Sequence, residues 1–347
     1  MKKIINWLGQ NLLHHSSVGA YFETVIQAVK PSWRTGYYRT HVHSVSELAK
    51  GVVSLWLVVD DKWPIHDPGQ HIELTIEING KLTTRVFTIA SAPKIARTKQ
   101  LINLVIKTQS NGQLTPILHQ LRPGEWLNIS APMGEFTVDK LENETLLLAA
   151  GSGITPFASI LSHLRHTKQS EKKLHLIYYA KPNEHLLVDE LKQYQSMSDN
   201  FSFELKSRSI DGGITPYLAP YHNSRFLVCG PAPFYQDIAD FTDVHGNELF
   251  SEHFALQPTT FVDKAQFNVL FKGKTFELDN TAPILNQLIE HGEQVRYGCK
   301  MGICHQCQCI KTQGVVKNLL TGNLSDKGEE LIQLCTSQLM TDLELKA

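Results

Sequence analysis

Four of the six cysteines in this 347-residue chain fall within eleven consecutive positions. The spacing Cys299-x4-Cys304-x2-Cys307, with Cys335 far downstream, is typical of the four thiolate ligands of a plant-type [2Fe–2S] cluster. Glycines within and just before this loop give it the freedom to surround the irons. A structural zinc site is the alternative, although zinc does not require the x4 spacing in a glycine-rich loop. Cys309 does not fit the ligand pattern, and we expect it to be a buried free thiol near the start of a strand.

A glycine motif follows the short apolar strand expected at Leu146 to Ala150. It reads Gly151-Ser152-Gly153-Ile154-Thr155-Pro156. Thr155 can cap a helix that begins at Pro156, and the glycines would let a pyrophosphate approach the exposed N–H groups. The third glycine of the usual dinucleotide fingerprint is absent, so a plain strand-to-helix turn is the alternative.

A second motif, Cys229-Gly230-Pro231, closes a later apolar strand, Phe226 to Cys229. The carboxyl ends of strands form the edge at which ligands bind in open α/β sheets. A thiol at that edge can touch a nicotinamide ring. A packed core cysteine is the alternative reading of Cys229.

The first half of the chain offers groups suited to a phosphate and a flat ring. Arg85 and Phe87 belong to the string Arg85-Val86-Phe87-Thr88, and strand alternation places both on one face. Lys107 and the turn Gly112-Gln113-Leu114-Thr115 could supply further phosphate donors. A solvated loop is the alternative for that turn.

Three successive patterns of apolar and polar residues along the chain indicate the elements that must position these groups. From about Tyr37 to Val138 short alternating strands predict an antiparallel β-barrel, with a hairpin whose strands flank Asn79-Gly80. From Leu141 continuous apolar strands separated by helical segments predict an α/β parallel sheet. Beyond about Thr260 we expect a strand pair at Gln266 to Leu278, a helix from about Ala282 to His291, and the cysteine loop.

Composition bounds the class of protein and its location. Lys plus Arg total 33 and Asp plus Glu 34, a near-neutral balance that argues against a nucleic-acid partner. No apolar stretch is long enough to cross a membrane, and the N-terminus lacks a secretory signal, so we expect a cytoplasmic protein. The first 45 residues carry five basic side chains and one acidic one, and apolar residues at helical spacing lie between Val18 and Val29. This segment predicts either a short helix packed on the body or a basic surface for peripheral association at the inner face of the membrane.

Taken in order, these strings resemble the ferredoxin–NADP reductase superfamily, in the branch with a plant-type ferredoxin domain at the C-terminus. Residues 85–88 resemble its R-x-Y-[ST] motif and residues 112–115 its G-x-x-[ST] motif. Residues 151–156 resemble its G-x-G-x-[ST]-P motif and residues 229–231 its C-G-P motif. The resemblance implies an N-terminal segment at 1–33, an FAD-binding antiparallel β-barrel at 34–140, an NAD(P)H-binding α/β domain at 141–257, and an α+β β-grasp [2Fe–2S] ferredoxin domain at 258–347.

The resemblance also implies roles for individual residues. Arg85 would bind the flavin pyrophosphate, Phe87 would pack on the isoalloxazine in place of the usual Tyr, and Thr88 would hydrogen-bond flavin N5. Cys229 would lie near the nicotinamide during hydride transfer. The expected FAD set is Arg85, Phe87, Thr88, Lys107, Gly112, Gln113, Leu114, Thr115 and Phe254, the last from an E-x-F ending that begins at Glu252. The expected NAD(P)H set is Gly151, Gly153, Ile154, Thr155, Pro156, Arg208, Cys229, Gly230 and Pro231.

These implications give one hypothesis for function and several alternatives. NADPH, favoured over NADH because Arg208 could hold a 2′-phosphate, would reduce FAD, and electrons would pass to the cluster and on to a protein acceptor. The cluster loop looks most like the reductases of membrane-bound fatty-acyl desaturases, so a membrane desaturase is the expected acceptor. A reductase of an aromatic-ring oxygenase or di-iron hydroxylase is the alternative. A non-catalytic redox sensor and a zinc-stabilised interaction module are the alternatives from other classes.

Overall fold

The chain divides into two compact units, Met1–Glu252 and His253–Ala347. The computed structural model describes residues 23–29, 38–78, 81–109, 112, 114–167, 171–252, 264–297, 300, 302, 306–319 and 322–346. Most of the N-terminal segment lies outside these residues, but helix α3 (Glu23–Val29) is described. Val25 and Val29 on α3 are 67% and 89% exposed, so these two side chains do not pack on the body as a buried helix face would.

A closed antiparallel sheet forms the first part of the larger unit, as the alternating strands predict. Its neighbours run in the order β4-β3-β6-β1-β2-β5. β4 and β5 are the edge strands of this order. An isolated bridge between Ile89, just after β4, and Leu104 on β5 joins these edges and closes the sheet. The strands are β1 (Tyr38–Ala49), β2 (Val52–Val58), β3 (His71–Ile78), β4 (Lys81–Thr88), β5 (Leu101–Lys107) and β6 (Trp126–Ile129).

Alternation along the barrel strands fills the interior. Ile72 and Leu74 on β3, Leu55 and Leu57 on β2, and Leu104 on β5 have no exposed surface and share one core. Burying each such side chain stabilises the fold by about 1.5–3 kcal/mol. The expected hairpin is present as β3 and β4, whereas its turn, Asn79-Gly80, lies outside the described residues. Short helices α4 (Pro93–Lys99), η1 (Thr115–Gln120) and η2 (Val138–Lys140) connect the strands.

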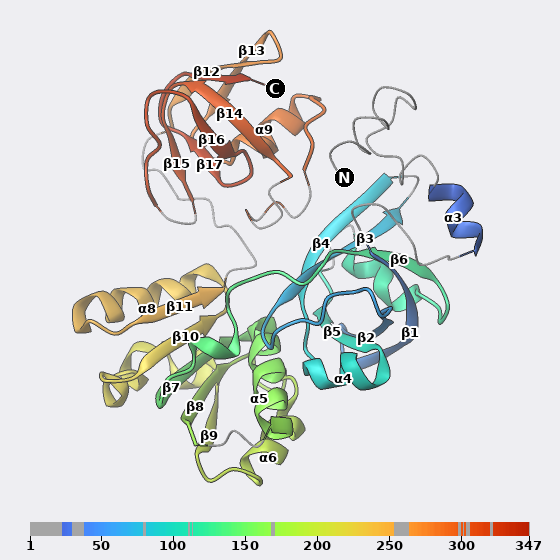
Figure 1. Cartoon of the computed structure of the whole chain (residues 1–347). Coiled ribbons are helices and arrows are strands. Elements are labelled where there is room, and N and C mark those ends of the chain that lie inside the picture. Colours follow the sequence, from blue (N-terminus) through green and yellow to red (C-terminus); the bar gives the residue numbers. More distant parts are fainter. Residues whose placement is uncertain are drawn as a thin grey trace, which may run out of the picture. The chain divides into compact units, whose positions relative to one another are not determined.

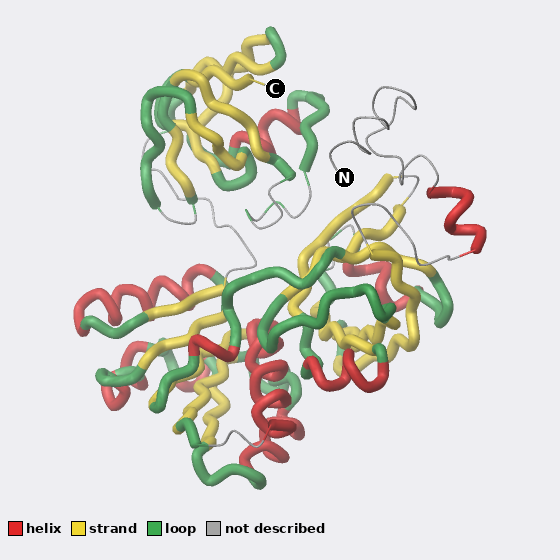
Figure 2. Tube along the Cα trace, viewed as in Figure 1, coloured by secondary structure: helices red, strands yellow, loops and turns green. Residues whose placement is uncertain are grey.

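A five-stranded parallel sheet forms the second part of the same unit, with the order β11-β10-β7-β8-β9. Its strands are β7 (Glu144–Ala150), β8 (Lys173–Tyr179), β9 (Phe201–Lys206), β10 (Arg225–Cys229) and β11 (Leu249–Glu252). The strand pairing thus confirms the parallel sheet that the sequence predicts. Strands of such a sheet are apolar throughout because both faces are covered. The connections contain η3 (Gly151–Ile154), α5 (Thr155–Thr167), α6 (Val188–Gln195), α7 (Arg208–Asp211), η4 (Thr215–Tyr217), η5 (Ala219–Tyr221) and α8 (Ala232–His245). Figure 1 shows α5 on the side of this sheet that faces the barrel, and Figure 2 shows the helices gathered around the parallel sheet.

Buried contacts join the barrel to the parallel sheet. Phe136 meets Phe157 of α5 edge to face, with 5.6 Å between the ring centroids. The carbonyl oxygen of Ser91 accepts hydrogen bonds from the Ser159 hydroxyl on α5 and from Nε2 of His66. Burial lowers the pKa of His66 to about 4, so its ring is neutral at physiological pH. The barrel and the sheet are thus packed as one body.

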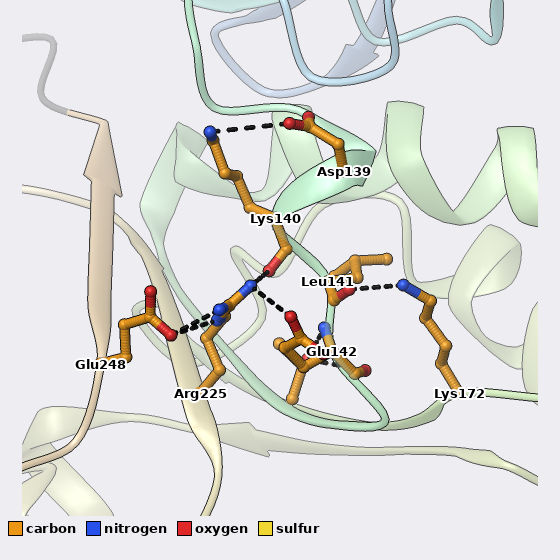
Figure 3. Close-up of polar contacts among 8 residues, drawn as sticks. Asp139, Lys140, Leu141, Glu142, Lys172, Arg225 and Glu248 are labelled. Atoms are coloured by element: carbon orange, nitrogen blue, oxygen red, sulfur yellow. Dashed lines mark hydrogen bonds and ion pairs between the residues drawn. The ribbon is translucent and has the colours of Figure 1, made fainter.

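Arg225, at the start of β10, secures the segment that leads from the barrel into the sheet (Figure 3). Its Nη1 donates to the carbonyl oxygen of Lys140 at 2.9 Å and lies 3.1 Å from Glu142. Its Nε donates to Glu248 at 2.9 Å, and its guanidinium lies over the ring of Phe250. One planar cation therefore ties the connecting segment to β11 at the end of the sheet opposite the strand carboxyl ends.

The C-terminal unit is a mixed five-stranded sheet with one helix. Its order is β13-β12-β18-β14-β16, in which β12 and β18 are parallel and the other neighbours antiparallel. The strands are β12 (Gln266–Phe271), β13 (Lys274–Asp279), β14 (Gln308–Gln313), β16 (Glu330–Gln333) and β18 (Leu343–Lys346), with a separate pair β15 (Val316–Asn318) and β17 (Ser337–Leu339). Helix α9 (Ile284–Glu290) buries Ile284, Leu285 and Leu288 in the core. The expected strand pair and helix are confirmed within a few residues.

We predict that Gly69→Ala destabilises the larger unit more than Gly246→Ala does. Both glycines have positive φ, but a Cβ at Gly69 would lie 2.2 Å from the carbonyl oxygen of Phe136, whereas the space at Gly246 is open. We expect Gly246→Ala to cost about 1 kcal/mol of unfolding free energy through backbone conformation alone. Gly69→Ala should cost about 2–4 kcal/mol, because overpacking adds to that strain. Chemical denaturation measures both, and equal losses would contradict the prediction.

Candidate active site

The strand order brings two loops together at the carboxyl edge of the parallel sheet. β7 and β10 are neighbours although two strands separate them in the sequence, which makes their ends the switch point of the sheet. The loop after β7 begins at Gly151, and β10 ends at Cys229. A Cβ at Gly153 would lie 2.1 Å from the carbonyl oxygen of Cys229 and 3.0 Å from the nitrogen of Gly230. The two predicted nucleotide motifs therefore touch, and only glycine permits this approach.

The structure corrects the expected start of helix α5. Thr155 already has helical backbone angles, φ −62° and ψ −43°, and its hydroxyl donates back to the carbonyl oxygen of Ser152 at 3.0 Å. It is therefore not the cap that the sequence predicts. The 3₁₀ turn η3 (Gly151–Ile154) leads directly into α5. Gly151 has φ +58° and open space at its Cβ position, which leaves room beside the helix N-terminus for a phosphate.

Cys229 is completely buried at the end of β10. Burial raises the pKa of its thiol well above the usual value, and the nearby carboxylate of Glu252 raises it further. The side chain is therefore a neutral thiol at physiological pH. Such a group can shape and contact a ring-binding site, but it is not an activated nucleophile.

The end of β4 carries the predicted flavin motif on two faces. Arg85 lies opposite Leu74 and Phe87 opposite Ile72, so Arg85 and Phe87 share a face, as the alternation predicts. Thr88 lies opposite His71 on the other face and is buried. Arg85 donates from Nη1 to the carbonyl oxygen of Thr84 and makes no ion pair among the described residues. Its guanidinium can therefore serve a phosphate.

Two other side chains that the sequence assigns to the flavin, those of Lys107 and Thr115, bind protein groups in the structure. Lys107 at the end of β5 forms an ion pair with Glu184, with 2.9 Å between Nζ and Oε2. The backbone N–H of Gln109 donates to the Thr115 hydroxyl oxygen at 2.9 Å. Leu114 is buried in the barrel core, and a Cβ at Gly112 would lie 2.9 Å from Thr115 Oγ1. Lys107 would therefore have to leave Glu184 in order to bind a phosphate. Gln113 and Phe254, the remaining predicted flavin contacts, lie outside the described residues.

Arg208 begins helix α7 just after β9. Its side chain is 67% exposed, and Nη2 lies 3.6 Å from a carboxylate oxygen of Asp237. Lys206 nearby is instead held by Glu204 and by the ring of Tyr217. Arg208 is thus the more accessible of these two cations.

In the C-terminal unit the structure describes two of the four predicted cluster ligands. Cys307 and Cys335 are both buried in the core, and the backbone N–H of Leu334 donates to the carbonyl oxygen of Cys307 at 3.1 Å. The backbone N–H of Gly302 donates to Sγ of Cys335 at 3.2 Å. Backbone N–H groups aimed at a sulfur are the surroundings that an iron–sulfur ligand requires. Cys299 and Cys304 lie outside the described residues.

One buried pair at the site was not assigned a role from the sequence. Nδ1 of His71, at the start of β3, lies 2.7 Å from Oε1 of Glu252, at the end of β11. Glu252 is also the register partner of Cys229 in the parallel sheet. The sequence marked Glu252 only as part of an E-x-F ending, and no pattern links it to a histidine 181 residues earlier.

Comparisons with known proteins match the two parts of the larger unit separately. Residues 50–138 match the oxidoreductase FAD-binding domain family, and residues 147–240 match the oxidoreductase NAD-binding domain family. NADH oxidoreductase HCR of Escherichia coli (strain K12) is 25% identical over 322 residues, which are 89% of this chain and 97% of that protein. The glycine betaine monooxygenase reductase subunit of Pseudomonas aeruginosa is 25% identical over 311 residues, 78% of this chain and 84% of that protein.

A solved structure shares the fold over most of the chain. Phthalate dioxygenase reductase has a TM-score of 0.61 at 22% identity, and the match covers 90% of this chain and 98% of that one. The strand orders, the glycine loop and the two domain matches together define the class. The protein is an oxidoreductase with an FAD-binding and an NAD-binding domain.

No helix among the described residues is both long and apolar enough to span a membrane.

We predict that Gly153→Ala impairs nucleotide use while a nearby control does not. The added Cβ would force the carbonyl oxygen of Cys229 away from the glycine loop. We expect kcat/KM for NAD(P)H-dependent ferricyanide reduction to fall at least about tenfold, which corresponds to about 1.4 kcal/mol of lost transition-state stabilisation. Gly213→Ala, where the space is open and φ is not positive, should retain wild-type kinetics. Unchanged kinetics in Gly153→Ala would show that the contact does not shape the site.

Proposed function

We propose that this protein is the reductase component of an oxygenase system, carrying electrons from NAD(P)H through FAD to a [2Fe–2S] cluster and then to a protein acceptor. The observation that carries the proposal is the contact of the glycine loop with the Cys229 loop at the carboxyl edge of the parallel sheet. In this proposal FAD binds within residues 34–140, NAD(P)H within 141–257 and the cluster within 258–347. The matched FAD-binding and NAD-binding domains support the first two assignments.

The flavin and nucleotide assignments rest on groups that the fold leaves available. Arg85, without an ion pair among the described residues, would bind the pyrophosphate of FAD, and Phe87 beside it would pack on the isoalloxazine. Thr88 would hydrogen-bond the flavin. Gly151 and the N-terminus of α5 would receive the nucleotide phosphates, and the neutral Cys229 thiol would contact the nicotinamide. When bound, FAD would accept a hydride and release electrons singly, which lets a two-electron donor serve a one-electron acceptor.

The cluster assignment rests on the buried cysteines of the C-terminal unit. Cys307 and Cys335 would be two of the four ligands, and Cys299 and Cys304 the others. The mixed sheet with α9 packed on it supports a β-grasp ferredoxin fold. Phthalate dioxygenase reductase, whose structure is described as modular for electron transfer from pyridine nucleotides to [2Fe–2S], matches this chain over 90% of its length.

The relatives favour an oxygenase over a membrane desaturase as the acceptor. Two of the similar proteins, the glycine betaine monooxygenase reductase subunit and phthalate dioxygenase reductase, are named as reductases of oxygenases. The desaturase that the cluster-loop sequence suggested has no such support. We therefore favour the alternative that the sequence leaves open, a reductase that passes electrons to a separate oxygenase protein.

An anaerobic titration tests this electron path. Flavin and iron–sulfur absorption bands of the purified protein should bleach together on addition of NAD(P)H. Cys335→Ser should lose the iron–sulfur bands and cytochrome c reduction but keep ferricyanide reduction by the flavin, because the cysteine belongs to the C-terminal unit alone. Cys309→Ser is the matched control and should keep the cluster, since Cys309 Sγ contacts the Lys346 carbonyl oxygen as a free thiol. A colourless wild-type protein containing zinc would contradict the proposal.

A second experiment tests the nucleotide preference. If Arg208 binds a 2′-phosphate, Arg208→Ala should raise KM for NADPH about ten- to a hundredfold, because a hydrogen bond to a charged group contributes about 1.5–3 kcal/mol. KM for NADH in the same variant should stay near the wild-type value, which provides the internal control. Steady-state kinetics with both nucleotides measure this. An equal rise for both would mean that Arg208 does not recognise the 2′-phosphate.

A further inference from the structure

A pocket of about 150 Å³ lies between the barrel and two helices of the parallel-sheet part. The barrel contributes Trp56 on β2, Asn103 on β5 and the segment after β4 that contains Ala90. Helices α5 and α6, which pack beside each other (Figure 1), form the opposite wall. None of the described residues that the sequence assigns to FAD or NAD(P)H lines this pocket. It is therefore a second cavity of the larger unit, outside the candidate active site.

The barrel wall of the pocket is an outward-facing patch of β2 and β5. Trp56 and Asn103 are register partners across these strands. Their chain neighbours Leu55 and Leu104 have no exposed surface and belong to the barrel core. Because side chains alternate along a strand, Trp56 and Asn103 point out of the barrel, toward the helices. Asn103 is nevertheless only 8% exposed, so this polar side chain lies at the covered end of the pocket.

The helix wall of the pocket is mainly apolar. Ala158 and Leu161 lie one turn apart on α5, and Leu191 lies on α6. Leu187, just before α6, has φ +57° and ψ +29°, a left-handed conformation that residues with a branched side chain rarely adopt. The structure thus keeps a strained residue at the wall of this pocket, as is common where a fold forms a ligand site. The small side chain of Ala158 leaves the space beside it open.

The amide of Asn103 presents an acceptor for which the described residues supply no donor. Its Nδ2 donates to the hydroxyl oxygen of Ser54 at 2.9 Å and to the carbonyl oxygen of Leu55 at 3.4 Å. Since a carbonyl oxygen can only accept, these contacts fix which end of the amide is nitrogen. Oδ1 accepts no hydrogen bond from the part of the chain that the structure describes. An acceptor in a covered position is stabilised when it gains a donor, so the pocket favours a ligand with a hydroxyl group.

Charge is confined to the mouth of the pocket. Arg165 and Glu190 are the charged residues among those that line it, and both are exposed. Nη1 of Arg165 donates to Oε1 of Gln193 at 2.7 Å, across from α5 to α6. The opposite charges of Arg165 and Glu190 give the mouth no net sign. A charged ligand group inside the pocket would lose water without gaining a charged partner, so the interior favours an uncharged ligand.

We propose that this pocket binds a small, uncharged aromatic molecule with one hydroxyl group, a phenol. Its ring would pack among Trp56, Leu161 and Leu191, and its hydroxyl would donate to Oδ1 of Asn103. Apolar cavities of about 150 Å³ accommodate a benzene ring, and an aromatic side chain in the wall adds a favourable ring contact. The inference does not depend on the proposed electron path. The bound molecule would contact the barrel and α5 together.

Calorimetric titration of the purified holoprotein with phenol tests the site. We expect a dissociation constant of about 0.1–1 mM, because a ligand of this size can gain only a limited free energy. Ala158→Leu should weaken binding at least about tenfold, since the larger side chain fills the pocket, and its melting temperature should not fall. Ala219→Leu is the matched control. Ala219 is exposed on η5 and does not line the pocket, so this variant should bind phenol as the wild type does.

Two further ligands test the chemistry of the pocket in the wild-type protein. Fluorobenzene has nearly the size of phenol but no donor, so it should bind at least about tenfold more weakly because Oδ1 of Asn103 stays unpaired. Benzoate should also bind at least about tenfold more weakly than phenol. Its carboxylate is costly to bury and has no hydrogen to donate to Asn103.

Three outcomes would overturn the inference. Equal phenol binding by Ala158→Leu and the wild type would place the phenol elsewhere, for example on the flavin. Equal binding of fluorobenzene and phenol would make the pocket a packing void that does not recognise a hydroxyl. Tighter binding of benzoate would make the mouth an anion site. If Ala158→Leu does not fold, the comparison of the three ligands on the wild-type protein still decides.

Discussion

The parallel pairing of β7 with β10 is the constraint on which the rest of the site depends. These strands are adjacent although β8 and β9 intervene in the sequence, so the chain must leave the sheet in opposite directions after each of them. The two loops that follow therefore diverge at the carboxyl edge, where ligands bind in open α/β sheets. Gly153 and Cys229 meet where the loops begin, and the missing side chain of the glycine sets the distance between the two backbones.

The barrel completes the site because several buried contacts fix it against the sheet. The aromatic pair of Phe136 and Phe157 contributes apolar area, and Ser159 hydrogen-bonds to Ser91 across the same boundary. The His71–Glu252 pair adds a polar contact near the strand ends themselves. Apolar contacts resist separation of the two parts but tolerate small sliding, whereas a short hydrogen bond between buried groups fixes direction as well as distance. The position of the flavin motif relative to the nucleotide motif is therefore determined by both kinds of contact.

Much of this arrangement follows from local sequence patterns. The sequence predicts the apolar strands at Leu146–Ala150 and Arg225–Cys229 and the β3–β4 hairpin. It does so because burial requires apolar residues at regular positions along each strand. Thr155 was interpreted wrongly as a helix cap because a 3₁₀ turn before it leaves no sequence signature distinct from a loop. The pairing of Lys107 with Glu184 joins residues 77 positions apart, and such contacts depend on how the two parts pack. The hydrogen bond between His71 and Glu252 could not be expected from the sequence for the same reason.

The division into two compact units bears on how electrons would leave the flavin. The proposed cluster belongs to a unit with its own core, which includes Cys307, Cys309 and Cys335. Residues 262–347 carry ten acidic and nine basic side chains, so long-range electrostatic steering toward the flavin unit would be weak. Covalent connection in one chain can replace steering, because a tether raises the effective concentration of one unit for the other. Transfer from the flavin to the proposed cluster would therefore depend only modestly on salt.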